Sequence, residues 1–175
     1  NGNMPFLLTC RNDPVFMATC TIRRYTVNQE QFAKEFKEDL VAQRYFLPMI
    51  IIKKATQEPV GFIYGHNLNK VDGLLYINTF VSEHYRGRGY GPLALLLFIR
   101  HCFQTTEQLY KIYMDAYEYA QSVSPMISGI QRFDFALEGR FSGHRLQDGR
   151  RWDMFRFAVY RDSLIRIETF LDRLV

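Results

Sequence analysis

The residues best suited to chemistry lie in a basic, glycine-rich segment between Val81 and Pro92. Glycines recur at every second position from 87 to 91, where the missing Cβ atom lets the backbone take positive φ and gather N–H groups around one anion. Arg86 and Arg88 add positive charge. The apolar run that follows predicts a helix whose positive N-terminal end points at the same place. The segment therefore predicts a site for a diphosphate or a similar anion.

Two common nucleotide motifs do not fit this loop. The Rossmann fingerprint requires G-x-G-x-x-G, whereas the glycines here are spaced G-x-G-x-G. The P-loop ends in Gly-Lys-Ser or Gly-Lys-Thr, and that ending is missing. Both readings are set aside on spacing alone.

The spacing Arg86-x-x-Gly89-x-Gly91 resembles the acetyl-CoA signature of the GNAT superfamily of N-acetyltransferases. Arg11-Asn12-Asp13-Pro14-Val15 resembles a stretch of the branch that contains the ribosomal-protein alanine acetyltransferases RimJ and RimL. The segment 135–140, followed by Asp148-Gly149-Arg150 and Tyr160-Arg161, resembles the closing hairpin of that branch. These motifs extend over roughly residues 4–164 and are more specific for the superfamily than for a substrate.

The resemblance implies that acetyl-CoA is the cosubstrate and that backbone N–H groups near the end of a strand contact its thioester and pantetheine. The residues implied in cofactor binding are Phe80, Val81, Arg86, Gly87, Arg88, Gly89, Tyr90 and Gly91. The implied fold is α/β (α+β): a mixed, mostly antiparallel central sheet flanked by helices. The family's usual first strand is missing, because the expected first helix already begins near Met4. Since the chain starts without Met, we expect either excision from a longer polypeptide, which we favour, or removal of residues before Asn1.

Acetyl transfer also requires a proton donor for the departing thiolate and a base for the amine. Relatives carry a Tyr donor after the fifth strand, but counting back from Phe135 places Ile130 there and Asp134 at the usual Gly position. The candidate substitutes are Tyr117, Tyr119 or a water molecule. For the base, Glu118 is the best-placed carboxylate, while His144 and His84 have intrinsic pKa values nearest to neutral.

Periodicity and turn signals predict the remaining elements. Helices are expected at 28–43, 93–104 and 125–132, and strands at 46–54, 60–68, 74–81, 109–119, 141–146 and 152–160. Residues 1–164 form the acetyltransferase domain, and 165–175 form a helical extension. The terminal helix carries an apolar stripe that we expect to pack on the domain's own sheet or on a second copy, and the stripe consists of Leu164, Ile167, Leu171 and Leu174.

Composition limits the possible partners. The 175 residues, 47% of them hydrophobic, suffice for one ordinary domain, and the net charge of +4 mildly favours anionic ligands such as CoA. Cys10, Cys20 and Cys102 are far apart, so we expect reduced thiols and no metal site. We expect a cytoplasmic protein with no membrane or nucleic-acid partner, because no long apolar run, signal peptide or RNA-binding motif is found.

Two functions remain open at this point. The first is an enzyme that transfers an acetyl group to a primary amine of a small molecule, such as an amino sugar or antibiotic intermediate, or of a protein N-terminus. The alternative is a degenerate GNAT-fold module that binds CoA or a carrier-protein pantetheine without efficient turnover, which Ile130 and Asp134 favour. A purely structural domain would have little reason to keep the arginine and glycines of the loop together. The partner is then a small-molecule or peptide amine, with a homodimer or a larger polypeptide possible.

Overall fold

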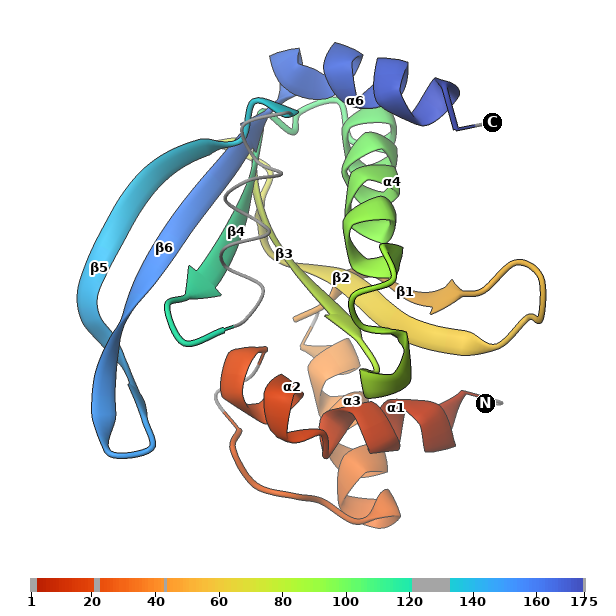
Figure 1. The fold of residues 1–175 in the computed structure, drawn as a ribbon, viewed down its shortest axis with the longest axis vertical. Coiled ribbons are helices and arrows are strands. Elements are labelled where there is room, and N and C mark those ends of the chain that lie inside the picture. The colour runs from red at the N-terminus through yellow and green to blue at the C-terminus, as the bar shows by residue number, and fades with distance from the viewer. Residues whose placement is uncertain (1–2, 21–22, 43, 121–132, 175) are drawn as a thin grey trace. The chain divides into compact units, whose positions relative to one another are not determined.

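The computed structural model describes residues 3–20, 23–42, 44–120 and 133–174. The chain forms two compact units. The first comprises residues 1–67 and 77–95, and the second comprises residues 68–76 and 96–175. Figure 1 follows the chain through both units, and each unit is described below by itself.

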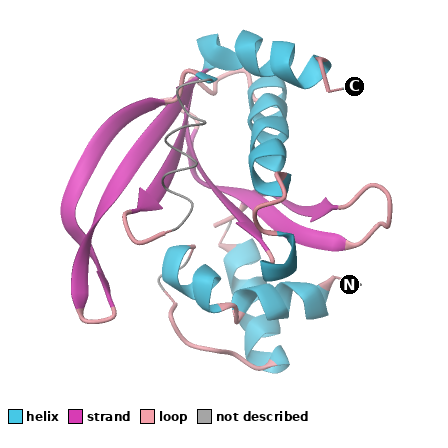
Figure 2. Cartoon of the chain, viewed as in Figure 1, coloured by secondary structure: helices cyan, strands magenta, loops and turns pink. Residues whose placement is uncertain are grey.

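Helices and strands both contribute to the fold (Figure 2). The helical elements are α1 (Met4–Arg11), α2 (Pro14–Thr19), α3 (Gln29–Val41), η1 (Glu83–Tyr85), α4 (Tyr90–Thr105), η3 (Arg161–Ser163) and α6 (Leu164–Asp172). The strands are β1 (Phe46–Ile52), β2 (Pro59–Asn69), β3 (Leu74–Val81), β4 (Lys111–Tyr117), β5 (Ala136–Gln147) and β6 (Arg150–Tyr160). They form one sheet in the order β1-β2-β3-β4-β6-β5. Strands β3 and β4 are parallel, whereas β1–β2, β4–β6 and β5–β6 are antiparallel, which confirms the predicted mixed, mostly antiparallel sheet.

Helix α3 of the first unit begins as the sequence predicts. The side chain of Asn28 accepts a hydrogen bond from the N–H of Gln31 at 2.9 Å, and the side chain of Gln31 accepts one from the N–H of Asn28 at 3.1 Å. This reciprocal capping box satisfies two N–H groups at the start of the helix. Phe32 on the predicted apolar face is buried, but Val41 is 77% exposed, so the expected stripe ends before the last residue of the helix.

The second unit contains the long β5–β6 hairpin. Its turn places Asp148 at φ 51° and Gly149 at φ 73°, the paired positive values that a tight hairpin turn requires. In β4, Ile112, Met114 and Ala116 are buried and alternate with half-buried residues, as predicted, although the strand is shorter than the expected 109–119. The predicted helix at 125–132 lies outside the described residues.

Two contacts close the second unit around the C-terminal half of α4. The guanidinium of Arg161 donates to the carbonyls of Phe103, Thr106 and Leu109 at 2.9, 2.6 and 2.7 Å, which satisfies acceptors at the end of that helix. Ile167 and Leu171 of α6 are buried, whereas Leu174 is 58% exposed. The apolar stripe of α6 is therefore covered within this unit over its central part.

Gly61 in β2 provides a test of how tightly the strands pack at the end of β3. A Cβ atom at this position would overlap the carbonyl oxygen of Phe80 and lie 3.1 Å from the Cα atom of Val81. We expect Gly61→Ala to lower the free energy of unfolding by about 1–3 kcal/mol, measured by urea denaturation. Gly91→Ala is the control, because its Cβ would meet the side chain of Val81 at an ordinary 3.4 Å. Equal stability of the two variants would contradict the close strand approach.

Candidate active site

The loop that follows β3 has the backbone geometry of an anion site. Gly87 has φ +73° and Gly89 has φ +84°, and a Cβ atom at either position would meet no atom within 4 Å. Helix α4 begins at Tyr90, directly after the loop, and the first N–H groups of a helix have no partner inside it. The loop is thus open on the side where a ligand would approach, and the positive end of the helix dipole lies beside it. These residues fit a diphosphate such as that of CoA.

Arg86 has a different environment from the one that the sequence suggests. Its guanidinium donates from Nε to the carbonyl of Val81 at 2.9 Å and from Nη2 to Oδ2 of Asp13 at 2.8 Å. It also lies over the ring of Phe80, 5.1 Å from the centroid. The positive charge of Arg86 is therefore already paired with a carboxylate of the protein, and its side chain ties the loop to the beginning of α2.

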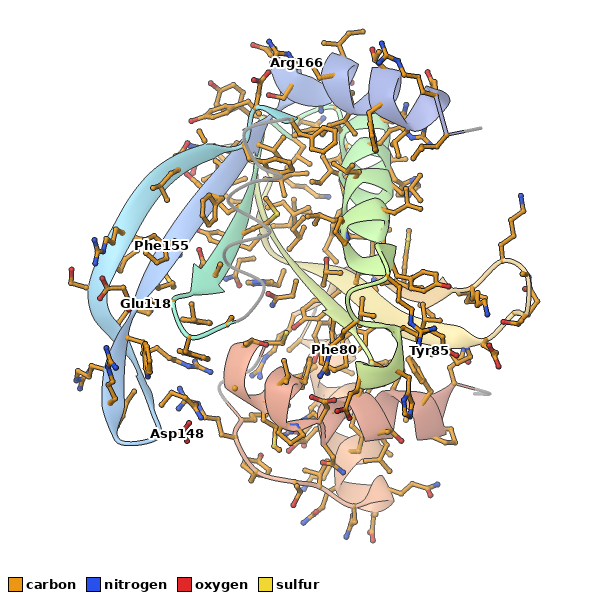
Figure 3. All side chains as sticks on the ribbon, in the orientation of Figure 1. Phe80, Tyr85, Glu118, Asp148, Phe155 and Arg166 are labelled. Carbon is orange, nitrogen blue, oxygen red and sulfur yellow. The ribbon has the colours of Figure 1, made fainter. Side chains whose placement is uncertain are left out.

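Arg88 is the more accessible cation of the loop. The residue is exposed, and its guanidinium lies 5.9 Å from the ring centroid of Tyr85. Tyr85 in turn contacts the ring of Tyr90 edge-on at 5.8 Å and donates its hydroxyl to Glu58 at 3.3 Å. Figure 3 labels Tyr85 in this segment. Tyr85 and Tyr90 thus pack against each other on either side of the loop in sequence, while Arg88 remains exposed.

The side chains of the Arg11-Asn12-Asp13 motif form hydrogen bonds that connect segments of the first unit. Arg11 donates to the carbonyl of Tyr25 at 3.0 Å, and Asn12 exchanges two 2.8 Å hydrogen bonds with the backbone of Val27. Oδ1 of Asp13 caps α2 by accepting from Val15 N at 2.7 Å, while its Oδ2 accepts from Arg86. All three side chains thus hold backbone segments in place.

A pocket of about 270 Å³ lies between α2, α3 and β2 of the first unit. Its aromatic lining consists of Phe16, Phe32, Phe36, Tyr45 and Tyr64, and its charged lining consists of Arg11, Arg23, Arg44, Glu35 and Asp39. Phe16 packs edge-on against Phe80 with 5.4 Å between ring centroids. The hydroxyl of Tyr64 accepts a 3.1 Å hydrogen bond from Asn78. Two lining residues therefore contact β3 immediately before Val81.

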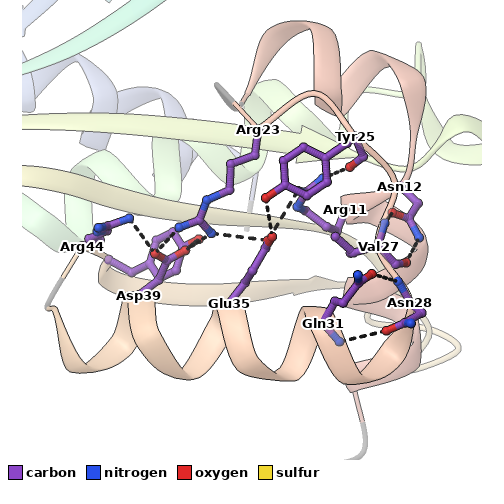
Figure 4. A network of polar contacts seen from close by, with 11 residues as sticks. Arg11, Asn12, Arg23, Tyr25, Val27, Asn28, Gln31, Glu35, Asp39 and Arg44 are labelled. Atoms are coloured by element: carbon purple, nitrogen blue, oxygen red, sulfur yellow. Dashed lines mark hydrogen bonds and ion pairs between the residues drawn. The ribbon is translucent and has the colours of Figure 1, made fainter.

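The charged side of this pocket is held together by Arg23, which reaches between two carboxylates of α3 (Figure 4). Arg23 binds Asp39 with two hydrogen bonds of 2.9 and 3.0 Å and contacts Glu35 at 3.4 Å. Asp39 is only 4% exposed and also accepts from Arg44 and from the hydroxyl of Tyr45, each at 3.0 Å. Burial and the neighbouring Asp39 raise the pKa of Tyr45, so its phenol stays protonated. No sequence motif pointed to this network.

The thiol of Cys10 is enclosed in the same region of the protein. Cys10 is buried with Phe16 and Phe80. Burial, together with the charge of Asp13, raises the pKa of Cys10 to about 12, so the thiol stays protonated at neutral pH. Because the thiolate is the reactive form of cysteine, Cys10 acts as a core residue rather than a nucleophile.

The four predicted catalytic residues lie in the second unit, three of them together at the end of β4. The rings of Tyr117 and Tyr119 stack with 5.6 Å between centroids, and Tyr119 meets Trp152 edge-on. Glu118 between them, labelled in Figure 3, is exposed, and its Oε2 accepts from the N–H of Asp153 at 3.3 Å. His144 is exposed on β5 and contacts the ring of Phe141 at 5.8 Å.

Asp153 is a residue of this region that the sequence did not single out. Its carboxylate accepts from the N–H of Gly143 at 2.8 Å and from Arg140 at 2.6 Å, and these donors hold its pKa below the usual value. Its backbone also exchanges hydrogen bonds with Glu118. Asp153 thereby ties the bend in β5 to the end of β4.

The sequence predicts departures from the family pattern at positions 130 and 134, and the structure describes only the second of these positions. Ile130 lies outside the described residues. Asp134 has φ +57°, the left-handed conformation that favours glycine, and its carboxylate pairs with Arg166 at 2.6 Å. Asp134 therefore keeps the backbone conformation that explains a Gly at this position in relatives, and only the residue type differs.

Two kinds of feature are not found in the described residues. No group of three or more His, Cys, Asp or Glu side chains there could hold a metal ion. In that same part of the chain, no helix combines the length and the apolar character needed to cross a bilayer.

Comparison with known families gives a match over most of the chain. Residues 14–134, which include the loop, α4 and the pocket helices, match the model of the acetyltransferase (GNAT) family. The chain belongs to the GNAT acetyltransferase family. It is accordingly an N-acetyltransferase that uses acetyl-CoA as cosubstrate, as the sequence motifs imply. A search of curated proteins finds no match.

Solved structures of GNAT enzymes share this fold at low sequence identity. A spermidine N-acetyltransferase from Vibrio cholerae, solved with CoA and spermine, has a TM-score of 0.79 at 14% identity, with 94% of each chain covered. RimL, a ribosomal L7/L12 α-N-protein acetyltransferase solved with CoA, has a TM-score of 0.77 at 16% identity, with 93% of this chain and 90% of that chain covered. A ribosomal-protein-alanine N-acetyltransferase from Brucella melitensis has a TM-score of 0.70 at 15% identity, with 91% of this chain and 94% of that chain covered.

The pairing of Asp13 with Arg86 can be measured with a double-mutant cycle. Asp13→Asn keeps an oxygen that can cap α2 but removes the charge, and Arg86→Gln removes the guanidinium. Because the ion pair is only partly exposed, we expect a coupling energy of about 1 kcal/mol in urea unfolding. The control cycle uses Arg100 and Asp172, which are 3.7 Å apart with a largely exposed carboxylate, and its coupling should be near zero. Equal coupling in both cycles would show that the Asp13–Arg86 contact does not hold the loop.

Proposed function

We propose that this GNAT domain transfers the acetyl group of acetyl-CoA to a primary amine of a small molecule or of a protein N-terminus, with the acceptor entering the pocket between α2, α3 and β2. The observation that carries the proposal is the loop after β3. Its two glycines with positive φ and the start of α4 form an open set of N–H donors. In a GNAT domain, the diphosphate of acetyl-CoA is sufficient to explain this loop geometry.

Within this proposal, the loop residues from Gly87 to Gly91 hold the CoA diphosphate through their backbone N–H groups, and Arg88 adds a surface charge. Arg86 acts as a positioning residue, because its guanidinium is paired with Asp13. The backbone at Phe80 and Val81 lies beside the thioester. When bound, acetyl-CoA supplies an activated acetyl group whose carbon–sulfur bond breaks as the carbon–nitrogen bond forms.

The pocket is the proposed entry for the acceptor because its walls reach the end of β3. Phe16 contacts Phe80, and Tyr64 contacts Asn78 two residues earlier on the same strand. An amine at the inner end of the pocket would therefore approach the part of β3 that is assigned to the thioester. Burial raises the pKa of Tyr64, and its neutral hydroxyl donates to the carbonyl of Cys20 at 3.4 Å while it accepts from Asn78.

The proton transfers are assigned as follows. The amine must lose one proton and the departing thiolate must gain one. We assign Glu118 or His144 to the first step, directly or through water, and Tyr117 or Tyr119 to the second.

The alternative function is a binding module without efficient turnover. Ile130, in the position of the usual tyrosine donor, favours it because an aliphatic side chain cannot supply a proton. General acid catalysis typically contributes about 10²- to 10⁴-fold to a rate, so its loss would leave a slow enzyme or none. The two functions share the CoA loop and differ in turnover.

Gly89→Val tests the loop directly. The β-branched side chain would strain a residue at φ +84° and occupy the open space where the diphosphate approaches. We expect the Kd for acetyl-CoA, measured by calorimetry, to rise by at least about tenfold, which corresponds to roughly 1.4 kcal/mol. Gly149→Val is the matched control, because Gly149 has φ +73°, equally open surroundings and a place in the β5–β6 turn.

The outcome separates the two functions. Weaker binding in Gly89→Val alone, together with release of free thiol in the presence of amines, supports the enzyme. The same binding result without any thiol release supports the module. Unchanged acetyl-CoA affinity in a folded Gly89→Val variant would overturn both.

A further inference from the structure

The lining of the acceptor pocket has an unusual balance of charge for a site that must receive an amine. Three arginines face two carboxylates, so the charged side chains leave one positive charge in excess. A cationic acceptor would normally be held by carboxylates that are free to bind it. Here the net charge of the lining is positive, as is the charge of an ammonium ligand.

The two carboxylates of the pocket are also occupied by the protein. Asp39 accepts from Arg23 through both oxygens, and further from Arg44 and Tyr45. Glu35 accepts from the hydroxyl of Tyr25 at 2.7 Å and contacts Arg11 and Arg23, each at 3.4 Å. A ligand with several ammonium groups would have to displace arginines from the buried Asp39 and the half-buried Glu35, which leaves poorly solvated charges without partners.

The rest of the lining offers aromatic surface in a continuous series. Ring centroids of Phe32 and Phe36 are 5.8 Å apart, those of Phe36 and Tyr45 are 6.3 Å apart, and those of Tyr45 and Tyr64 are 4.9 Å apart. The series extends from α3 to β2. Aromatic side chains at these separations bind further rings by edge-on or offset contacts.

We propose that the acceptor is an aromatic monoamine, a primary amine on a ring-bearing body with no second positive charge, rather than a polyamine. The inference rests on the proposed function and specifies its substrate class. The ring packs on the Phe36–Tyr45–Tyr64 wall. The excess positive charge of the lining disfavours the ammonium form and so lowers the pKa of the bound amine, which increases the fraction of the neutral, nucleophilic form.

The test compares three amines with the same chain. 2-Phenylethylamine has one amine and a ring, hexylamine has one amine and no ring, and spermidine has several amines. We expect kcat/KM to fall in that order, with 2-phenylethylamine at least about tenfold above spermidine. Dissociation constants of the three amines, measured by calorimetry in the presence of CoA, should follow the same order.

Two pocket variants test separately what the excess charge of the lining and what its aromatic wall contribute to selectivity. Arg44 is 62% exposed at its side chain, so Arg44→Gln should fold while removing the excess charge. This variant should lower the ratio of kcat/KM for 2-phenylethylamine to kcat/KM for spermidine by at least about threefold. Phe36→Leu should reduce the preference for 2-phenylethylamine over hexylamine. Lys37→Gln is the control, since Lys37 is exposed on α3, carries the same charge as Arg44 and does not line the pocket.

The possible results distinguish failure of the proposed substrate class from failure of the proposed enzyme function. Spermidine binding or turning over as well as 2-phenylethylamine, or a preference that Arg44→Gln and Lys37→Gln alter equally, would overturn the substrate class while leaving the acetyltransferase function intact. Binding of 2-phenylethylamine in the expected order without turnover would overturn the proposed enzyme and keep the pocket's selectivity.

Discussion

The ion pair between Asp13 and Arg86 is the interaction on which the arrangement of the first unit depends. One oxygen of Asp13 caps α2, and the other accepts from the arginine that also binds the carbonyl of Val81. A single carboxylate thereby fixes the start of a pocket helix, the end of β3 and the beginning of the anion loop. With Arg86 engaged in this way, our proposal assigns the diphosphate to the backbone N–H groups of the loop, the start of α4 and the surface charge of Arg88.

The same ion pair sets the position of the pocket. Phe16 follows the capped start of α2 and packs on Phe80, while Cys10 fills the space behind both rings. The wall of the pocket and the strand end assigned to the thioester are therefore in contact through one aromatic pair. A shift of α2 would move the proposed acceptor pocket and the proposed cofactor loop together, and our proposal therefore makes Arg86 a positioning residue.

The sequence was informative where a local backbone requirement dictates the residue type. Gly87 and Gly89 of the loop take positive φ, and the Asp148-Gly149 turn and the N-cap at Asn28 form as short-range geometry predicts, whereas Gly91 lies in α4. It was less informative where function depends on partners far apart in the chain. Asp13 and Arg86 are 73 positions apart, and nothing in either motif shows that they pair with each other.

The pocket was missed for a related reason. Its residues come from α1, α2, α3, β2 and the connections between them, and only Arg11 belongs to a motif that the sequence singles out. Asp39 looks like a surface residue in a charged helix, yet it is buried because three guanidinium bonds and a phenol compensate its charge. Asp134 departs in residue type from the glycine of the family pattern, and its positive φ is a conformation that favours glycine. Composition and spacing do not reveal either fact.

The most direct test of the account is a titration of the ¹⁵N-labelled chain with CoA, followed by two-dimensional NMR. The account predicts large shifts for the backbone amides of Gly87, Gly89 and Gly91, while the Nε–H signal of Arg86 keeps the position set by its bond to the carbonyl of Val81. A large shift of the Arg86 side-chain signal with unchanged loop amides would contradict it, because the arginine would then bind the diphosphate itself and the loop would not.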